Sequence, residues 1–210
     1  MTAYARIFLI LTLTLLLTAA CAGQLKKPAR RIDFYTLEYP SPQPAGKAPL
    51  PVVLGVQRFR VAPTYNTQKI VYRDRNFKRN TYQYHKWRAE PGDLVGYFLA
   101  RDLTQAAVFR AVFSLEKNLP TSHIIEGTVD EFFESDTSRS WEAVLTVSIT
   151  LMKTMEPDIS KRIISQKTYR ARKPCGQKNP RALAAAMSLA MAEISEAVMN
   201  DVYASLADEK

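Results

Sequence analysis

The chain has 210 residues, a formal net charge of +9 and two cysteines, Cys21 and Cys175. This length suits one domain with a sizeable core and would be cramped for two. A basic chain usually binds nucleic acid, anionic lipid or acidic proteins. Nucleic acid is excluded here, because the first 20 residues predict export, as the next paragraph describes.

The first 20 residues predict a secretory signal peptide. Arg6 precedes an apolar run over residues 7–17, which is too short to span a bilayer as a stable helix, and the small residues at 18–20 follow. Residues 17–21 read LTAAC, which resembles the bacterial lipobox, whose cysteine receives a diacylglycerol and becomes the first residue after cleavage. Thr18 stands where the lipobox usually has Leu. The alternative is an ordinary secretory signal that is cleaved near a cysteine.

Lipid on Cys21 would attach the domain to a membrane, because each buried CH₂ group of an acyl chain contributes about 0.8 kcal/mol. Ala22 follows the cysteine. The resemblance to bacterial lipoproteins therefore implies transfer to the periplasmic face of the outer membrane, since a residue other than Asp stands there. Residues 22–31 are polar and basic, so we expect a flexible tether over residues 21–31 and a domain over residues 32–208.

The first half of the domain predicts four strands, two of them in a hairpin, and a helix. A strand over residues 32–37 precedes a Pro-rich surface connection at 39–51, and an apolar run at 52–59 predicts a central buried strand. Strands at 69–73 and 81–87 around a basic turn at 74–80 predict a β-hairpin. Pro91 begins a helix to about residue 107, with apolar residues at helical spacing.

The second half predicts a meander and a long helix. Residues 108–113 form a short connection or strand, and strands follow at 123–134, 140–153 and 162–172. A polar turn at 135–139 and a loop at 155–161 separate these three strands. Asn179 as N-cap and Pro180 at the first helical position begin the last helix.

Several of these segments resemble one known family when they are taken as a set. They are DFYTLEYP at 33–40, LGV at 54–56, IVYR at 70–73, the Tyr82, Tyr84 and Trp87 strand, Pro91, VFRAV at 108–112, EGTVDEF at 126–132 and the Trp141 strand. The chain from Asp33 to about Val202 resembles the ABC-type transport auxiliary lipoproteins, the PqiC-like proteins associated with MCE lipid-transport systems.

The resemblance implies a single compact α/β domain with a mixed β-sheet flanked by helices, to which the pattern adds a protruding β-hairpin and a long C-terminal helix. It also implies a non-catalytic accessory subunit on the outer membrane that docks MCE-domain and permease subunits and maintains envelope integrity. It carries over no catalytic residue and no cofactor. A second copy of the chain is a further expected partner, through Cys175.

The hairpin region interleaves aromatic and basic residues, and this mixture is typical of a contact surface. The candidate contact residues for a partner or a membrane are Tyr72, Arg73, Arg75, Lys78, Arg79, Tyr82, Tyr84 and Trp87. The alternative is that the aromatic members pack on the domain while the cations are solvated.

Other reactive residue types lack the neighbours that catalysis needs. His85 and His123 have no carboxylate or thiol at metal spacing, and Cys175 has no evident base. The acidic residues along the strand at 123–134, namely Glu126, Asp130, Glu131 and Glu134, are interpreted as a solvated face. We therefore expect no enzyme and no cofactor. The alternative functions are a stand-alone lipoprotein that scaffolds or activates envelope enzymes, and a periplasmic carrier that holds lipid in an apolar cavity.

Overall fold

The computed structural model describes residue 4 and residues 31–44, 46–74, 77–114, 119–137 and 140–209. The chain divides into two units, Met1–Arg31 and Ile32–Lys210, and the second unit is the folded domain described below. The expected lipid site Cys21 and nearly all of the signal and tether lie outside the described residues.

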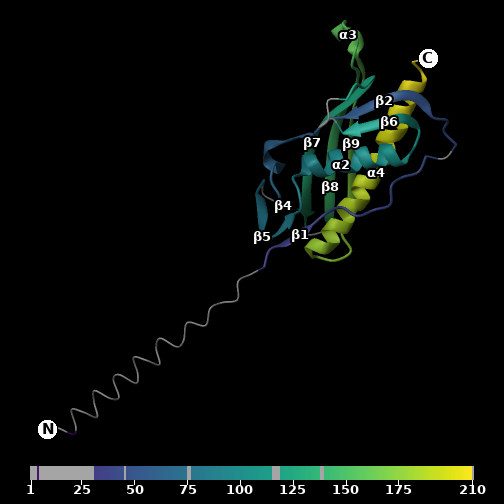
Figure 1. The fold of residues 1–210 in the computed structure, drawn as a ribbon. Helices are drawn as coiled ribbons and strands as arrows, with labels where there is room; N and C mark the ends of the chain where they lie inside the picture. The colour runs from purple at the N-terminus through teal and green to yellow at the C-terminus, as the bar shows by residue number, and fades with distance from the viewer. Residues whose placement is uncertain are drawn as a thin grey trace. The chain divides into compact units, whose positions relative to one another are not determined.

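One mixed sheet forms the centre of the domain (Figure 1). Its described strands are β1 (Asp33–Tyr35), β2 (Leu50–Val56), β3 (Arg60–Val61), β4 (Lys69–Arg73), β5 (Arg79–Trp87), β6 (Phe109–Ser114), β7 (His123–Asp136), β8 (Trp141–Lys153) and β9 (Ile163–Pro174). Strand β7 pairs with β8 along one edge, antiparallel. Along its other edge it pairs in turn with β2, β3 and β4, all parallel. The long strand β7 therefore joins all parts of the sheet.

The predicted hairpin and meander are confirmed. Strands β4 and β5 are antiparallel, and β7, β8 and β9 form an antiparallel meander. Strand β4 also pairs with β7 at Tyr72 and Arg73, and β5 pairs with β1 at residues 85–87, so the β4–β5 hairpin is part of the sheet. The segment that stands out in Figure 1 is the end of the β8–β9 hairpin, where the short helix α3 (Ile159–Arg162) begins inside the predicted loop and ends on the first residue of the predicted strand.

Two longer helices pack on the sheet. Helix α2 (Pro91–Gln105) begins at the expected proline, and helix α4 (Pro180–Ala207) begins where the Asn179 side chain accepts a hydrogen bond from the Ala182 N–H at 2.9 Å. The apolar residues of α4 form a stripe that lies in the core, because each is 3% exposed or less: Leu183, Met187, Ala190, Met191, Ile194, Val198 and Val202. Helix α4 is long and apolar enough to span a membrane by length and composition, but it packs against β8, β9 and α2, as the core helix of a folded domain does.

The Pro-rich connection between β1 and β2 runs along the outside of α4. The Glu38 N–H donates to Ser188 Oγ at 2.9 Å near the start of the helix, and Lys47 Nζ donates to Asn200 Oδ1 at 2.5 Å near its end. Tyr203 OH donates to the Ala48 carbonyl at 2.8 Å. We call residues 37–49 the strap. In this unit β1 lies at one end, and α3 and the C-terminus lie at the opposite end (Figure 1).

Candidate functional site

The aromatic residues of the β4–β5 hairpin form a packed polar cluster. Tyr72 lies edge-on to Tyr82, with ring centroids 5.2 Å apart. The Tyr82 hydroxyl lies 3.1 and 3.0 Å from the two carboxylate oxygens of Glu134, which is only 1% exposed. Burial raises the pKa of Glu134, while the Tyr82 and Trp141 side chains act against that rise. Burial next to this carboxylate also raises the pKa of Tyr82.

The position of Glu134 corrects the interpretation of the β7 carboxylates as one solvated face. The register of β7 against β8 shifts between Val129 and Glu131, because a bulge adds one residue. Glu126 lies opposite Thr150, whereas Glu134 lies opposite Ala143, on the face where Ala143 and its alternate neighbours are buried. The bulge thus turns Glu134 toward the interior, while Glu126 and Asp130 stay half-buried.

Trp87, one of the candidate contact residues, lies in the core. It is 1% exposed and packs edge-to-face on Phe132, with ring centroids 5.1 Å apart and an interplanar angle of 79°. For Trp87 the alternative given above is therefore correct: this side chain packs in the domain and is not part of a contact surface. Tyr84 is half-buried.

The basic candidates lie beside this core and at the hairpin tip. The guanidinium carbons of Arg73 and Arg79 lie 4.6 and 5.9 Å from the centroid of the Phe133 ring. Phe77 and Lys78 are exposed at the tip, where Phe77 has a positive φ of 59°. Within the described ranges, no carboxylate forms an ion pair with Arg73, Lys78 or Arg79. Arg75 lies outside those ranges. We call Phe77, Lys78 and Arg79 the hairpin tip.

A second polar cluster, which the sequence did not predict, centres on Asp102 in helix α2. This carboxylate is completely buried. Its Oδ2 accepts hydrogen bonds from Tyr39 OH at 2.7 Å and from Ser195 Oγ at 2.6 Å, and its Oδ1 accepts from Nε and Nη2 of Arg101 at 2.9 and 2.7 Å. The cluster therefore joins the strap, α2 and α4. One feature of the sequence could have indicated this cluster: Asp102 lies three residues after Leu99, on the apolar face of α2, where a carboxylate needs buried partners.

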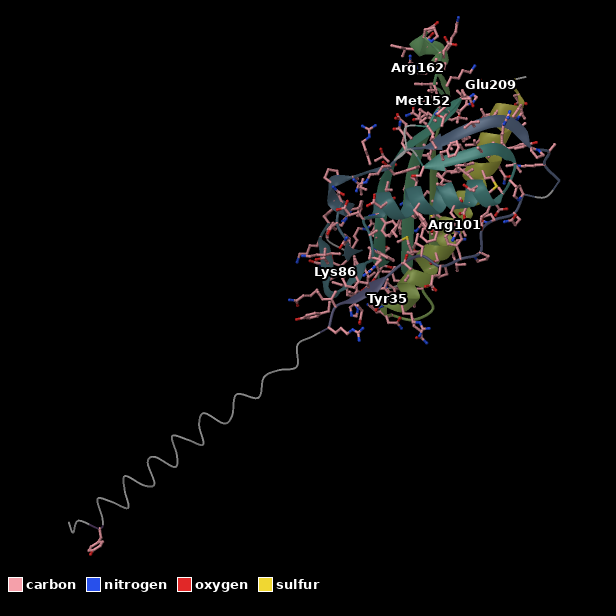
Figure 2. All side chains as sticks on the ribbon, in the orientation of Figure 1. Tyr35, Lys86, Arg101, Met152, Arg162 and Glu209 are labelled. Atoms are coloured by element: carbon pink, nitrogen blue, oxygen red, sulfur yellow. The ribbon has the colours of Figure 1, made fainter. Side chains whose placement is uncertain are left out.

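Arg101 connects this cluster to a groove on the surface of the domain. Its guanidinium carbon lies 4.4 Å from the Tyr39 ring centroid and 4.6 Å from that of Phe98. The groove has a volume of about 800 Å³, and helix α2 provides most of its lining. Figure 2 labels Arg101 on this helix and Tyr35 toward the β1 end of the domain.

The histidines and Cys175 have structural neighbours. His85 Nδ1 lies 3.2 Å from Tyr35 OH, and His123 Nε2 lies 3.3 Å from a Glu209 oxygen. Burial raises the pKa of the Cys175 thiol to about 11. Across the part of the chain that the structure describes, no group of three His, Cys, Asp or Glu side chains is placed to hold a metal ion.

Comparison with known proteins identifies the family. Residues 35–199 match the family model described as the ABC-type transport auxiliary lipoprotein component. This match covers most of the chain, so the chain is an auxiliary lipoprotein of ABC-type transport. It belongs to the ABC-type transport auxiliary lipoprotein family, as its motifs suggested, and the lipoprotein family implies attachment to a membrane by lipid. A comparison with curated proteins found no significant match.

Solved structures with the same fold have diverged far in sequence. Protein XCC0632 from Xanthomonas campestris has a TM-score of 0.75 at 13% identity, over 84% of this chain and 98% of that chain. The hypothetical protein CT253 from Chlamydia trachomatis has a TM-score of 0.53 at 8% identity, over 75% of this chain and 98% of that chain. At such low identity these structures show that the fold is shared and no more.

Proposed function

We propose that the protein is a non-catalytic accessory subunit of an MCE-type lipid transport system that maintains envelope integrity, anchored to the periplasmic face of the outer membrane. The observation that carries this proposal is the family match over residues 35–199, which spans nearly the whole folded domain. The motif set adds the MCE association, and the lipobox-like LTAAC with Ala22 supports the outer-membrane position.

The proposed docking surface is the hairpin tip together with Arg73 and Arg75. Phe77 is 101% exposed, and a fully exposed aromatic ring beside cations gives a partner both apolar area and charge to bind. Lys78 and Arg79 are exposed and have no described carboxylate partner, so their charge is available to an acidic surface. The partner that fits is an acidic surface of an MCE-domain or permease subunit.

Charge reversal at the tip tests this docking surface. The variant Arg75→Glu, Lys78→Glu and Arg79→Glu should lose co-purification of transporter subunits from native membranes, because like charges would then face each other across the interface. A matched control reverses the exposed cations Arg60, Arg110 and Arg181, which lie on other elements. Equal co-purification of the wild type and the tip variant, with equal detergent sensitivity of the cells, would reject the docking role.

Cell fractionation tests the anchor separately. Cys21→Ala should move the protein from the outer-membrane fraction to the soluble periplasm, because the acyl chains supply the attachment. Intact-mass measurement of the wild type should find fatty acyl mass on Cys21. A Cys21→Ala protein that still sediments with membranes would require another anchor.

The identity of the captured proteins separates the main proposal from a stand-alone scaffold. MCE-domain and permease subunits in the pull-down support the transport role. Capture of peptidoglycan synthases without transporter subunits would favour the scaffold instead.

A further inference from the structure

Helix α2 forms one wall of an open groove large enough for a ligand. The groove volume of about 800 Å³ lies within the range of small-molecule sites, about 300–1,000 Å³. The opposite wall is the end of β2 and the two residues that follow it, Val56 to Arg58, and Thr36 and Arg88 line the groove as well. Most of the exposed lining surface is apolar.

The groove exists because α2 approaches the segment after β2 closely and presents small residues. A Cβ atom on Gly92 would lie 2.3 Å from the Phe59 carbonyl oxygen, so the helix and this segment are in direct contact there. One and two turns later, Gly96 and Ala100 line the groove with no side chain or only a methyl group, and a Cβ atom on Gly96 would lie 3.6 Å from the Phe59 ring. Tyr97 borders this space and is 67% exposed.

Three arginines line the groove, and they differ in how their charge is used. Arg58 forms ion pairs with Asp93 and Glu90. Arg101 is held in a fixed orientation by Asp102, which occupies its Nε and Nη2. Arg88 is exposed, and its described contact is with the Phe34 ring, 5.5 Å from the guanidinium carbon. No carboxylate pairs with Arg88 within the described ranges, so its charge is available to an anion.

A fatty chain with an anionic end matches this lining better than a peptide does. The largest wall is a helix, whose backbone N–H and C=O groups are bonded within the helix, so this wall offers a peptide no backbone groups to pair with. An acyl chain needs no hydrogen bonds, and burying it is favourable in proportion to its length.

We propose that this groove binds an anionic lipid, with an acyl chain along Ala100 and its phosphate or carboxylate at Arg88. The protein would then hold lipid directly as well as dock its partners. This inference goes beyond the proposed accessory role and does not depend on which subunits the hairpin tip contacts.

Photo-crosslinking in cells tests the groove on the full-length lipoprotein. Benzoylphenylalanine replaces Tyr97 at the groove, and in a matched control it replaces Leu189, which is 58% exposed on α4 and outside the lining. After irradiation, the purified protein should gain the mass of one lipid at position 97 and not at 189. Fragmentation of the adduct distinguishes a phospholipid from a free fatty acid, and either supports the proposal.

Two substitutions in the crosslinking protein test the assigned contacts. Ala100→Leu fills the groove, and Arg88→Glu reverses the free charge at an exposed position where folding is not at risk. Each should lower the lipid adduct at least about tenfold, the effect of a change of 1.4 kcal/mol in binding. Arg110→Glu, an exposed charge reversal on β6, should leave the adduct unchanged.

The other outcomes would overturn the lipid assignment. A protein adduct at position 97 would make the groove a docking site. A crosslink to the protein's own N-terminal peptide with no gain in mass would make its own anchor the occupant. No adduct, or equal lipid adducts at 97 and 189, would show that the groove does not select lipid. Co-purified transporter subunits are identified in the same samples, so failure of this inference is distinguishable from failure of the proposed function.

Discussion

Replacing Asp102 by Ala should destabilise the domain strongly. The change leaves the Arg101 guanidinium between two aromatic rings without its counter-charge, and it leaves the Tyr39 and Ser195 hydroxyls without their acceptor. The Arg101 side chain is only 21% exposed, so water replaces the lost partner poorly. Removing one member of a buried ion pair costs about 3–5 kcal/mol. We expect the free energy of unfolding of Asp102→Ala to fall by that amount.

Urea unfolding of the detergent-solubilised full-length protein measures this loss, with tryptophan fluorescence as the signal because Trp87 lies in the core. Ser195→Ala is the graded control: it removes one hydrogen bond to the carboxylate and should cost less, about 1.5–3 kcal/mol. The double variant Arg101→Met, Asp102→Leu removes both charges but still leaves the Tyr39 and Ser195 hydroxyls without an acceptor, so it should recover part of the loss. The reasoning is refuted if Asp102→Ala costs less than about 1 kcal/mol, or if the double variant costs as much as the single one.

Three further predictions concern local packing and titration. Gly96→Ala should stabilise the domain by up to about 1 kcal/mol through helix propensity, because the new Cβ would lie 3.6 Å from the nearest Phe59 atom, which is an ordinary contact. Gly92→Ala should destabilise the domain by about 1–3 kcal/mol, because its Cβ would lie 2.3 Å from the Phe59 carbonyl oxygen. Equal urea midpoints for the two variants would contradict this prediction. Burial raises the pKa of Glu134 above its ordinary 4.5, so its contribution to stability is greatest at low pH and is lost as the pH rises through the raised pKa. The free energy of unfolding of the wild type relative to Glu134→Gln should therefore decrease from about pH 4 to pH 7, and a flat difference would exclude the burial effect. The pKa of about 11 for Cys175 predicts iodoacetamide labelling at pH 8 about two orders of magnitude slower than for an ordinary cysteine, measured by peptide mass spectrometry; fast labelling would show a reactive thiolate.

The regular elements could be predicted because their patterns are long. The apolar stripe of α4 repeats along a helix of 28 residues and the alternation of β8 runs along a strand of 13, so each pattern identifies its own buried face. Strand β3 has two residues and helix α3 has four, and both are too short to show a repeating pattern of apolar residues. Hence both were missed, although the hairpin, the meander and both long helices were predicted.

The polar clusters could not be predicted because their members are distant in sequence. Tyr39 and Ser195 lie 63 and 93 residues from Asp102, and no local pattern brings them together. Glu134 was misassigned for a different reason: alternation assumes an unbroken strand, and one inserted residue reverses the faces that follow. The groove could not be predicted either, because Gly96 and Ala100 line it only once α2 has packed against the segment after β2.

The strap connects β1 to the two long helices, and this connection decides which contacts a pull on the N-terminal end would load first. A pull on the N-terminal end first loads β1, which pairs with β5 through only three residues. The next contacts along the chain are those of the strap. Leu37 is buried, the Glu38 N–H bonds to Ser188, and the Tyr39 hydroxyl bonds to Asp102. Tension that peels β1 away is thus passed to the two long helices before it reaches β7. We therefore expect a domain held by its N-terminus to yield first at β1, while the central sheet stays closed.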